Sequence, residues 1–405
     1  MLMPAGRRGR PTPHTVVVPS PILLVPVLVL VLFATLLYRR LVRAPGYQSV
    51  WLRVGAIAVL AGLGIAVFVG FAYQSAALDD RGARLIGMIG MTWLATAFYL
   101  LLGTLVGALV ALGLRLTRRR DLIGPWHRRS VPVIVTVSLL VTGYGFVEAR
   151  QLRVTAQTVT VPSLPAGLEG YRLAVISDLH AGPIRGADLV ARVVDLTNRA
   201  DPDVVLLVGD LTDGTTAQFG PVLRPLSGLD SADGVLAVTG NHEYYAGDAA
   251  GWVELWRELG ITPLLNESLT IEHAGATLRL AGVSDAAGSD AGIDAPAPGL
   301  RPDLRAALKD VTAQEPTVLL AHQPGVGTDP AVRSAGVDLM VSGHTHGGQI
   351  WPFTLLVGLA NPTVVGLDEV EGTTAYTTRG AGTWGPPVRF LVPPEIAVLT
   401  LTAGD

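Results

Sequence analysis

The chain of 405 residues has no cysteine. This absence excludes disulfides, thiolate metal sites and cysteine nucleophiles, and it leaves the redox compartment undetermined. Charged residues are also scarce: they make up 16% of the sequence, and the mean hydropathy is +0.45. This combination excludes a disordered chain and disfavours a wholly soluble protein.

The few charges are distributed unequally along the chain. Residues 1–150 contain 16 Arg and four acidic residues, a net charge of +12, whereas residues 151–405 contain 14 basic and 29 acidic residues, a net charge of −15. The overall charge of −3 therefore hides two chemically different halves. We expect a membrane domain over residues 1–150 and a second domain of another kind over residues 151–405.

Four long apolar runs lie in the first half, and none of them contains a charged residue. About 20 apolar residues in a helix cross a hydrocarbon layer of about 30 Å, so the runs predict an all-α bundle of about four transmembrane helices. Charges within a membrane mark ion paths and proton relays, and their absence argues against a transporter or channel. The runs are residues 21–37, 54–73, 85–114 and 131–147.

The first run has an alternative interpretation as a cleaved signal peptide, with Arg7, Arg8 and Arg10 as its basic start. No Ala-x-Ala cleavage site follows the run, and Arg39–Arg40 is typical of a membrane border. We therefore favour a transmembrane helix.

The arginines also predict an orientation. With four spans, the N-terminus and the second half lie on the same side of the membrane, and short Arg-rich loops stay in the cytoplasm. The two loops on the opposite side carry ten Arg, against seven near the spans on the side of the second half. We expect a multi-pass protein of the cytoplasmic membrane whose second half lies outside the cytoplasm.

From residue 151 the pattern changes to short apolar runs separated by Gly, Pro, Asp and Asn. Helical patterns at residues 188–200 and 249–259 lie between these runs, and such alternation predicts an α/β fold with a mostly parallel sheet. The runs that predict buried strands are residues 173–177, 204–208, 235–238, 278–283, 317–321 and 339–342.

Polar side chains follow these strands, at the end of an α/β sheet where ligands bind. Because residues two apart in an extended chain point to the same side, Asp178 with His180, and His344 with His346, can each direct two donors into one pocket. The polar residues at the strand ends are Asp178, His180, Asp210, Asp213, Asn241, His242, His322, His344 and His346.

Asp, Asn and His without thiolate suit divalent ions such as manganese, iron(II), zinc or magnesium. Two ions are needed to use this many ligands, and two ions about 3.5–4 Å apart can clamp the attacking and leaving oxygens of a displacement at phosphorus. Asp210 is the natural bridging carboxylate, because it lies between the group around Asp178 and the group around Asn241.

The order and content of these motifs resemble the calcineurin-like metallophosphoesterases over about residues 155–401. The matching blocks are Asp178-x-His180, Gly209-Asp210-x-x-Asp213, Gly240-Asn241-His242-Glu243, His322 and Gly343-His344-x-His346. The runs ISDLHAG at 176–182 and SGHTHGGQI at 342–350, with the tail 379–395, are similar to a membrane-associated bacterial subgroup that includes YkuE-like and UDP-2,3-diacylglucosamine hydrolase-like proteins.

This resemblance implies a four-layer α/β/β/α sandwich, a dinuclear metal site and direct attack by a metal-activated, bridging hydroxide. It also implies that His242 stabilises a phosphoryl oxygen or protonates the leaving group, and that Asp213 orients a ligand or its loop. A simple loop cap is the alternative for Asp213. The implied ligands are Asp178, His180, Asp210 and His346 for one metal, and Asp210, Asn241, His322 and His344 for the other.

We therefore expect a membrane-tethered phosphoesterase that hydrolyses a phosphodiester or pyrophosphate. A membrane sensor or binding module that retains the fold without turnover is the alternative, and the intact His242 favours the enzyme. The net charge of −15 on the second half disfavours long nucleic acids. Tethering to a bilayer favours an amphiphilic substrate, lipid- or nucleotide-linked, and leaves a small soluble phosphodiester open. Arg379 and Arg389 can either meet phosphate or form structural salt bridges.

Overall fold

The computed structural model describes residues 20–75, 77–78, 81–162, 164–182, 184–290, 297–312 and 314–404. Arg7, Arg8 and Arg10, which enter the prediction of orientation, lie outside the described residues.

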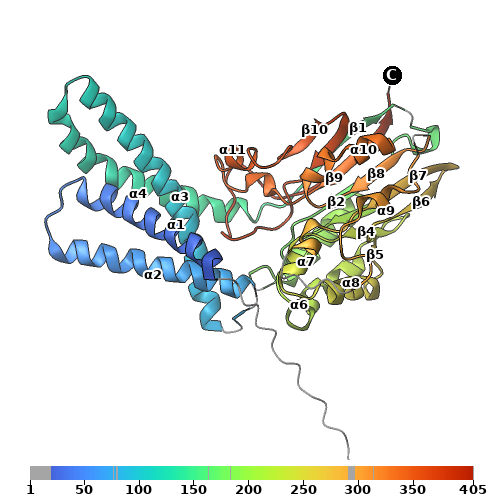
Figure 1. Ribbon diagram of the computed structural model, residues 1–405, viewed down its shortest axis with the longest axis horizontal. Helices are drawn as coiled ribbons and strands as arrows, with labels where there is room; N and C mark the ends of the chain where they lie inside the picture. The colour runs from blue at the N-terminus through green and yellow to red at the C-terminus, as the bar shows by residue number, and fades with distance from the viewer. Residues whose placement is uncertain are drawn as a thin grey trace, which may run out of the picture.

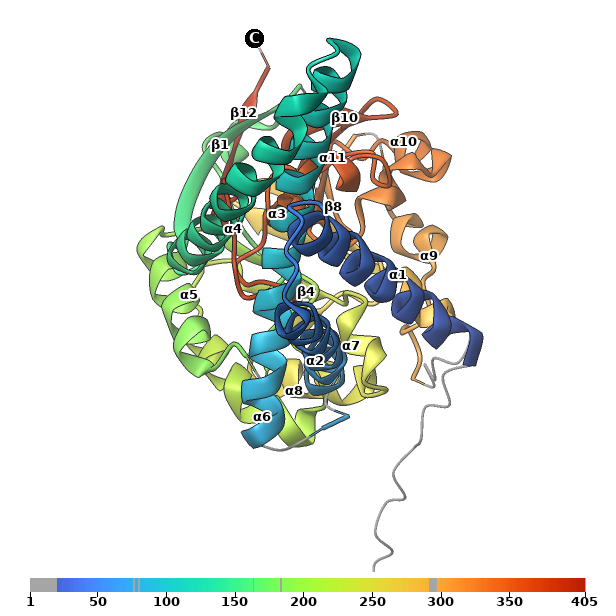
Figure 2. The same cartoon turned by 90° about the vertical axis from the view of Figure 1, so that its left-hand side faces the viewer.

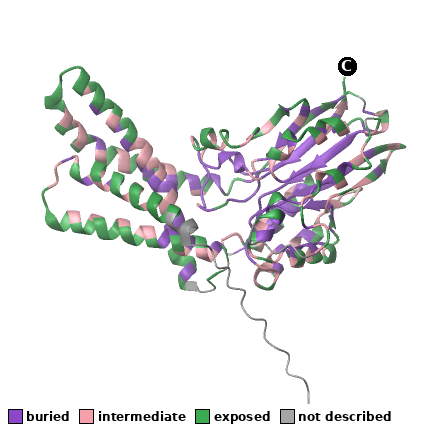
Figure 3. Ribbon diagram, viewed as in Figure 1, coloured by how far each residue is buried: buried purple, intermediate pink, exposed green. Residues whose placement is uncertain are grey.

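Four long apolar helices form the first part of the described chain, and each coincides with one predicted run. All four are long and apolar enough to cross a membrane. Many of their large apolar side chains are exposed, such as Leu28, Ile57, Leu105 and Leu140, which is typical of helices that face lipid (Figure 3). They are α1 (Ser20–Tyr38), α2 (Val50–Gln74), α3 (Arg81–Leu116) and α4 (Ile123–Glu148). The prediction of four apolar helices is confirmed.

Small residues let α2 and α3 pack closely. A Cβ atom on Gly90 of α3 would lie 2.1 Å from the carbonyl carbon of Ala66 in α2, so only glycine fits at this contact. Helices α3 and α4 are joined by polar contacts: the Thr96 hydroxyl lies 3.2 Å from that of Thr142, and the Trp126 indole donates to the Gly107 carbonyl at 2.9 Å. These contacts hold α2, α3 and α4 together as one unit.

Two six-stranded mixed sheets form the second part, in the orders β1-β12-β2-β3-β4-β5 and β10-β11-β9-β8-β7-β6. The first contains β1 (Arg153–Val161), β2 (Arg172–Ile176), β3 (Val204–Val208), β4 (Val235–Val238), β5 (Thr262–Pro263) and β12 (Glu395–Ala403). The second contains β6 (Glu267–His273), β7 (Ala276–Gly282), β8 (Thr317–Leu320), β9 (Leu339–Ser342), β10 (Gly366–Val370) and β11 (Thr373–Thr377).

The side-chain alternation along the strands produces the layers. In β2, Leu173 and Val175 pack between the two sheets together with Leu280 of β7, whereas Ala174 and Ile176 pack on the outer face of the first sheet. The central strands β3, β8 and β9 are buried on both faces, as expected where helices cover a sheet. In Figure 2, α5 (Ala187–Arg199) lies on one side of the strands and α10 (Pro330–Ala335) on the other.

The covering helices complete a four-layer α/β/β/α sandwich, which confirms the fold that the resemblance implies. Helices α5 (Ala187–Arg199), α6 (Thr216–Leu223) and α8 (Ala249–Glu258) contribute to the core on the first sheet. Helices α9 (Leu304–Leu308) and α10 (Pro330–Ala335) do the same on the second. Two further short helices are α7 (His242–Tyr245) and α11 (Thr354–Val357).

The membrane helices contact the sandwich directly. Ala95 of α3 packs in one apolar cluster with Ile350 and Val388. At the end of α4, the buried Glu148 accepts a hydrogen bond from the Leu391 backbone amide at 2.8 Å. Figure 2 shows the molecule from the side of the long helices, with α1 and α2 in front of the sandwich. The junction brings α1 and α3 close to one edge of the sheets.

Candidate metal centre

All of the predicted site residues come together at one edge of the sandwich. They lie in the loops that follow β2, β3 and β4 of the first sheet and β8 and β9 of the second. These strands run parallel within each sheet, so their carboxyl ends meet, and the loops from both sheets converge.

The backbone of these loops is left-handed at most of the proposed ligands. A positive φ is uncommon for a residue with a Cβ atom and costs about 1–3 kcal/mol. We expected an extended chain to align Asp178 with His180 and His344 with His346. The backbone at these residues is not extended, and sharp turns place their side chains in the site instead. The φ angles are +55° for Asp178, +45° for His180, +51° for Asp210, +69° for His344 and +52° for His346.

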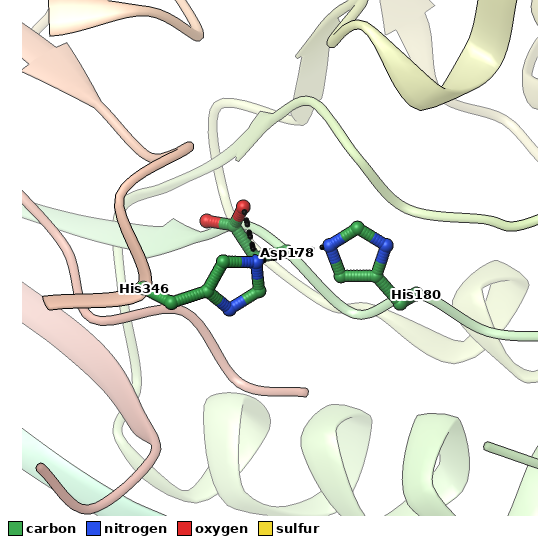
Figure 4. Close-up of side chains that lie close together, drawn as sticks. All are labelled: Asp178, His180 and His346. Carbon is green, nitrogen blue, oxygen red and sulfur yellow. Dashed lines mark hydrogen bonds and ion pairs between the residues drawn. The ribbon is translucent and has the colours of Figure 1, made fainter. Parts of the chain in front are cut away.

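Asp178, His180 and His346 form the first group of potential ligands, with ligand atoms all within 4.8 Å of one another. Nε2 of His180 lies 3.1 Å from Nε2 of His346, which lies 3.4 Å from Oδ1 of Asp178. All three residues are buried, and their donor atoms point toward one another (Figure 4). Two imidazole nitrogens facing a carboxylate are a donor set suited to a divalent cation.

Asp210, His322 and His344 form the second group. His322 donates from Nδ1 to the Val208 carbonyl at 2.8 Å, which directs its Nε2 into the site, 3.2 Å from Oδ2 of Asp210. This Nε2 is buried and has no hydrogen-bond partner among the described residues. Asn241 joins the group, because its Oδ1 lies 2.9 Å from Nδ1 of His344. An orphaned buried nitrogen beside a carboxylate fits a metal ligand.

Asp210 lies between the two groups. Its Oδ2 is 3.7 Å from Nε2 of His180 in the first group and 3.2 Å from Nε2 of His322 in the second. This is the position that a bridging carboxylate requires.

Asp213 contacts two imidazoles rather than only capping its loop. Its Oδ1 accepts from Nδ1 of His180 at 3.0 Å and from Nδ1 of His242 at 2.7 Å. Burial would raise the pKa of Asp213, but His180 and His242 lower it to about 2. Burial would likewise lower the pKa of His242, but Asp210 and Asp213 raise it to about 9. The two carboxylates therefore favour the protonated form of His242.

Two of the imidazoles are held neutral. Burial and His322 lower the pKa of His344 to about 4. Burial and His180 hold the pKa of His346 well below its usual range. Neutral imidazole is the form that binds metal.

Sequence reasoning gave no role to Glu243, although it follows His242 directly. Its buried carboxylate accepts hydrogen bonds from the backbone amides of Gly240 (2.7 Å), Asp210 (3.0 Å) and Leu211 (2.8 Å). It therefore ties the loop after β3 to the loop after β4. Burial and Asp210 raise the pKa of Glu243 to about 8. The only signal in the sequence is its place beside His242, at the end of the block Gly240-Asn241-His242-Glu243.

Both C-terminal arginines make structural contacts. The Arg379 guanidinium pairs with Glu395, with Nε at 3.0 Å and Nη2 at 2.5 Å from Oε2. Arg389 is fully buried, donates to the carbonyls of Gly382 and Arg379 at 2.7 Å each, and lies 3.4 Å from Nδ1 of His346. Of the two alternatives, the structure favours structural contacts over phosphate binding.

A cavity of about 640 Å³ lies over the potential ligands. Asp210, Asn241, His242, His344 and His346 line it on the side of the sandwich. Side chains of α1, α3 and the segment around α11 line it elsewhere.

The amino-acid sequence of the chain is similar to those of known metallophosphoesterases. Residues 171–348 match the calcineurin-like phosphoesterases. The chain is 36% identical over 305 residues to a Danio rerio protein described as a transmembrane protein with metallophosphoesterase domain, over 73% of this chain and 68% of that protein. It is 30% identical over 331 residues to an uncharacterised metallophosphoesterase of Campylobacter jejuni, over 80% of this chain and 83% of the relative. It is 28% identical over 271 residues to the uncharacterised metallophosphoesterase YkuE of Bacillus subtilis, over 64% and 90%.

Proposed function

The chain belongs to the calcineurin-like phosphoesterase family, and from this membership we propose that it is a membrane-tethered, two-metal phosphoesterase acting on a phosphodiester or pyrophosphate. One observation carries the proposal. Two groups of Asp and His ligand atoms lie on either side of Asp210, and His242 lies close to both Asp210 and His180.

The donor set fits two divalent ions, because the buried Nε2 of His322 faces the Asp210 carboxylate and the Nε2 atoms of His180 and His346 face each other. Asp178, His180, Asp210 and His346 would hold one ion, and Asp210, Asn241, His322 and His344 the other. Mixed oxygen and imidazole ligands suit manganese, iron, zinc or magnesium. When bound, such ions supply Lewis acidity and lower the pKa of a water molecule.

The protein's own groups would then do the following. The Nδ1–H of His242 is fixed by Asp213, so its other nitrogen is free to give a proton to a phosphoryl or leaving-group oxygen in the cavity. Asp213 also orients His180 through its Nδ1–H, an arrangement that strengthens a histidine ligand. The hydrogen bonds that fix His242 beside the proposed ligands suit proton transfer and favour the enzyme over a sensor module without turnover.

The surroundings of the site bear on substrate and location. The apolar part of the cavity favours an amphiphilic phosphodiester or pyrophosphate, and the acidic second half disfavours nucleic acid.

We place the membrane domain at residues 1–150 and the metallophosphoesterase domain at 151–405, because α4 ends at Glu148 and β1 begins at Arg153. The α1–α2 and α3–α4 connections lie at the far end of the helices from the sandwich (Figure 1). Their arginines favour a site outside the cytoplasm.

The test is hydrolysis of bis(4-nitrophenyl) phosphate by the purified full chain, with metal content measured in parallel. Chelation should abolish hydrolysis, and manganese should restore it. Asp210→Ala should lose more metal than Asp178→Ala or His346→Ala, since Asp210 faces both groups. Two ions still bound in Asp210→Ala would refute the bridging role, and binding of two ions without any hydrolysis would support the sensor module.

A further inference from the structure

The cavity over the metal centre joins the two halves of the protein. Opposite the potential ligands, its wall consists of Phe33 of α1, Leu94 and Phe98 of α3, and Phe353, Leu356 and Val357 in and beside α11. Helices α1 and α3 are both candidate membrane spans. Segments more than two hundred residues apart in sequence therefore enclose one space.

The contact between α3 and the α11 segment is specific. The rings of Phe98 and Phe353 meet edge to face, with centroids 5.8 Å apart and planes at 87°, a preferred aromatic geometry. Beside them, the Tyr99 hydroxyl donates to the Trp351 carbonyl at 3.0 Å. The apolar wall is therefore preformed, as in most small-molecule sites.

The two ends of the cavity are lined by different kinds of side chain. Ionisable side chains occur only at the metal-centre end, and no Lys or Arg is present among the described residues that line the cavity. The amide of Gln349 is already engaged with the backbone of Trp384 and Pro386. A second anionic group, such as the remainder of a nucleoside diphosphate, would have no cationic partner in this space. A hydrocarbon chain would meet mostly apolar surface, and the polar side chains of Thr345, Gln349 and Asn361 that also line the cavity already donate to backbone carbonyls.

We propose that the membrane helices form part of the substrate site: α1, α3 and α11 hold the hydrocarbon chain of an amphiphile whose phosphoester lies at the metal centre. This inference rests on the proposed phosphoesterase function and narrows its substrate to lipid-linked esters. The size agrees, since about 640 Å³ lies within the roughly 300–1,000 Å³ of ligand pockets, and a phosphate fills only part of it. The spans are then a wall of the active site as well as an anchor.

The test uses 4-nitrophenyl alkyl phosphodiesters with ethyl, butyl and octyl chains, at monomeric concentrations, with the metal-loaded full chain in nanodiscs. A methylene buried from water is worth roughly four-fold in affinity. We therefore expect kcat/KM to rise at least ten-fold from ethyl to octyl. An equal kcat/KM for all three esters would overturn the inference and leave the phosphoesterase function intact. Two bound ions without hydrolysis of any ester would instead overturn the function.

Matched variants distinguish binding of the alkyl chain in the cavity from its partitioning into the lipid of the nanodisc. Leu356 lines the cavity, whereas its neighbour Leu355 is 67% exposed and does not. Leu94 lines it on α3, whereas Leu105 on the same helix is 56% exposed and does not. Leu356→Ala and Leu94→Ala should lower the octyl-to-ethyl ratio of kcat/KM about three- to ten-fold, and Leu355→Ala and Leu105→Ala should keep it.

A variant that fills the space gives a second measurement that does not depend on the core of α3. Val357→Trp should cut octyl hydrolysis at least ten-fold more than ethyl hydrolysis, and Leu359→Trp, at a residue 83% exposed and outside the cavity, should not. Equal losses in lining and control variants would show that the chain preference arises in the bilayer, and the inference would be wrong.

Discussion

Oδ1 of Asp213 lies 2.7 Å from Nδ1 of His242. The same oxygen is 3.0 Å from Nδ1 of His180. One carboxylate thus holds both a proposed metal ligand and a proposed proton donor in fixed orientations.

Asp213→Asn should change the pH profile as well as the rate. Loss of a carboxylate that orients a ligand histidine typically lowers metal affinity or activity about 10–100-fold. Asp213 raises the pKa of His242, so its removal lowers that pKa. A general acid must be protonated, and activity therefore falls as pH rises through its pKa. The alkaline limb of kcat/KM should move to lower pH in Asp213→Asn, and an unmoved limb would show that Asp213 acts only on the loop.

His242→Ala should separate chemistry from metal binding. Asn241 and Asp210 remain, so the content of two ions per chain should stay near that of the wild type. The rate should fall by roughly 10²–10⁴-fold, as for a lost acid–base group. Elemental analysis and turnover, measured on the same sample, provide the check. Full activity with both metals present would mean that His242 has another role.

The residues that the sequence predicts for one site lie together in the structure, because strand ends are visible in the pattern. Val204–Val208 is an uninterrupted apolar run, and the polar Asp210 that follows it falls at the sheet edge for that reason. Asp178 and His346 come from different sheets, yet the same rule places both. The apolar pattern does not predict strands of mixed composition such as Glu267–His273 and Gly366–Val370, because each has only one buried residue, Ile271 and Val370 respectively.

Other features depend on tertiary contacts that no local pattern records. No local pattern predicts the positive φ of Asp210 and His346, or the close approach of Gly240, where a Cβ would lie 2.3 Å from Oδ1 of Asp210. The role of Glu243 consists of hydrogen bonds to backbone amides of another loop. The apolar wall of the cavity requires Phe33 to meet residues more than three hundred positions later.

Glu395→Gln should weaken the fold and flatten its acid sensitivity. The buried carboxylate accepts from Arg379 and from the hydroxyls of Thr155, Tyr376 and Thr378 at 3.0–3.1 Å. Burial would raise its pKa, but the backbone amide and guanidinium of Arg379 lower it below the ordinary value. A depressed pKa stabilises the folded state fully above the ordinary pKa, and this stabilisation is lost as pH falls through the folded value.

Breaking such a buried pair costs about 3–5 kcal/mol, so the apparent Tm of Glu395→Gln at neutral pH should fall by several degrees. Its Tm should also decline less than that of the wild type as pH drops below about 4.5. Glu369→Gln, at an exposed position of β10, is the matched control and should behave like the wild type. A Glu395→Gln Tm equal to that of the control at neutral pH would contradict the prediction.

The catalytic part should be reached from outside the cell. The Arg-rich connections at the far end of the helices predict a cytoplasmic location for them, and the sandwich lies at the other end. Because the chain has no cysteine, single-cysteine variants can report orientation without background. Glu272→Cys on the sandwich should react with a membrane-impermeant maleimide in intact, wall-stripped cells. Thr117→Cys at the α3–α4 connection, also exposed, should react only after lysis. The reverse labelling pattern would place the active site in the cytoplasm.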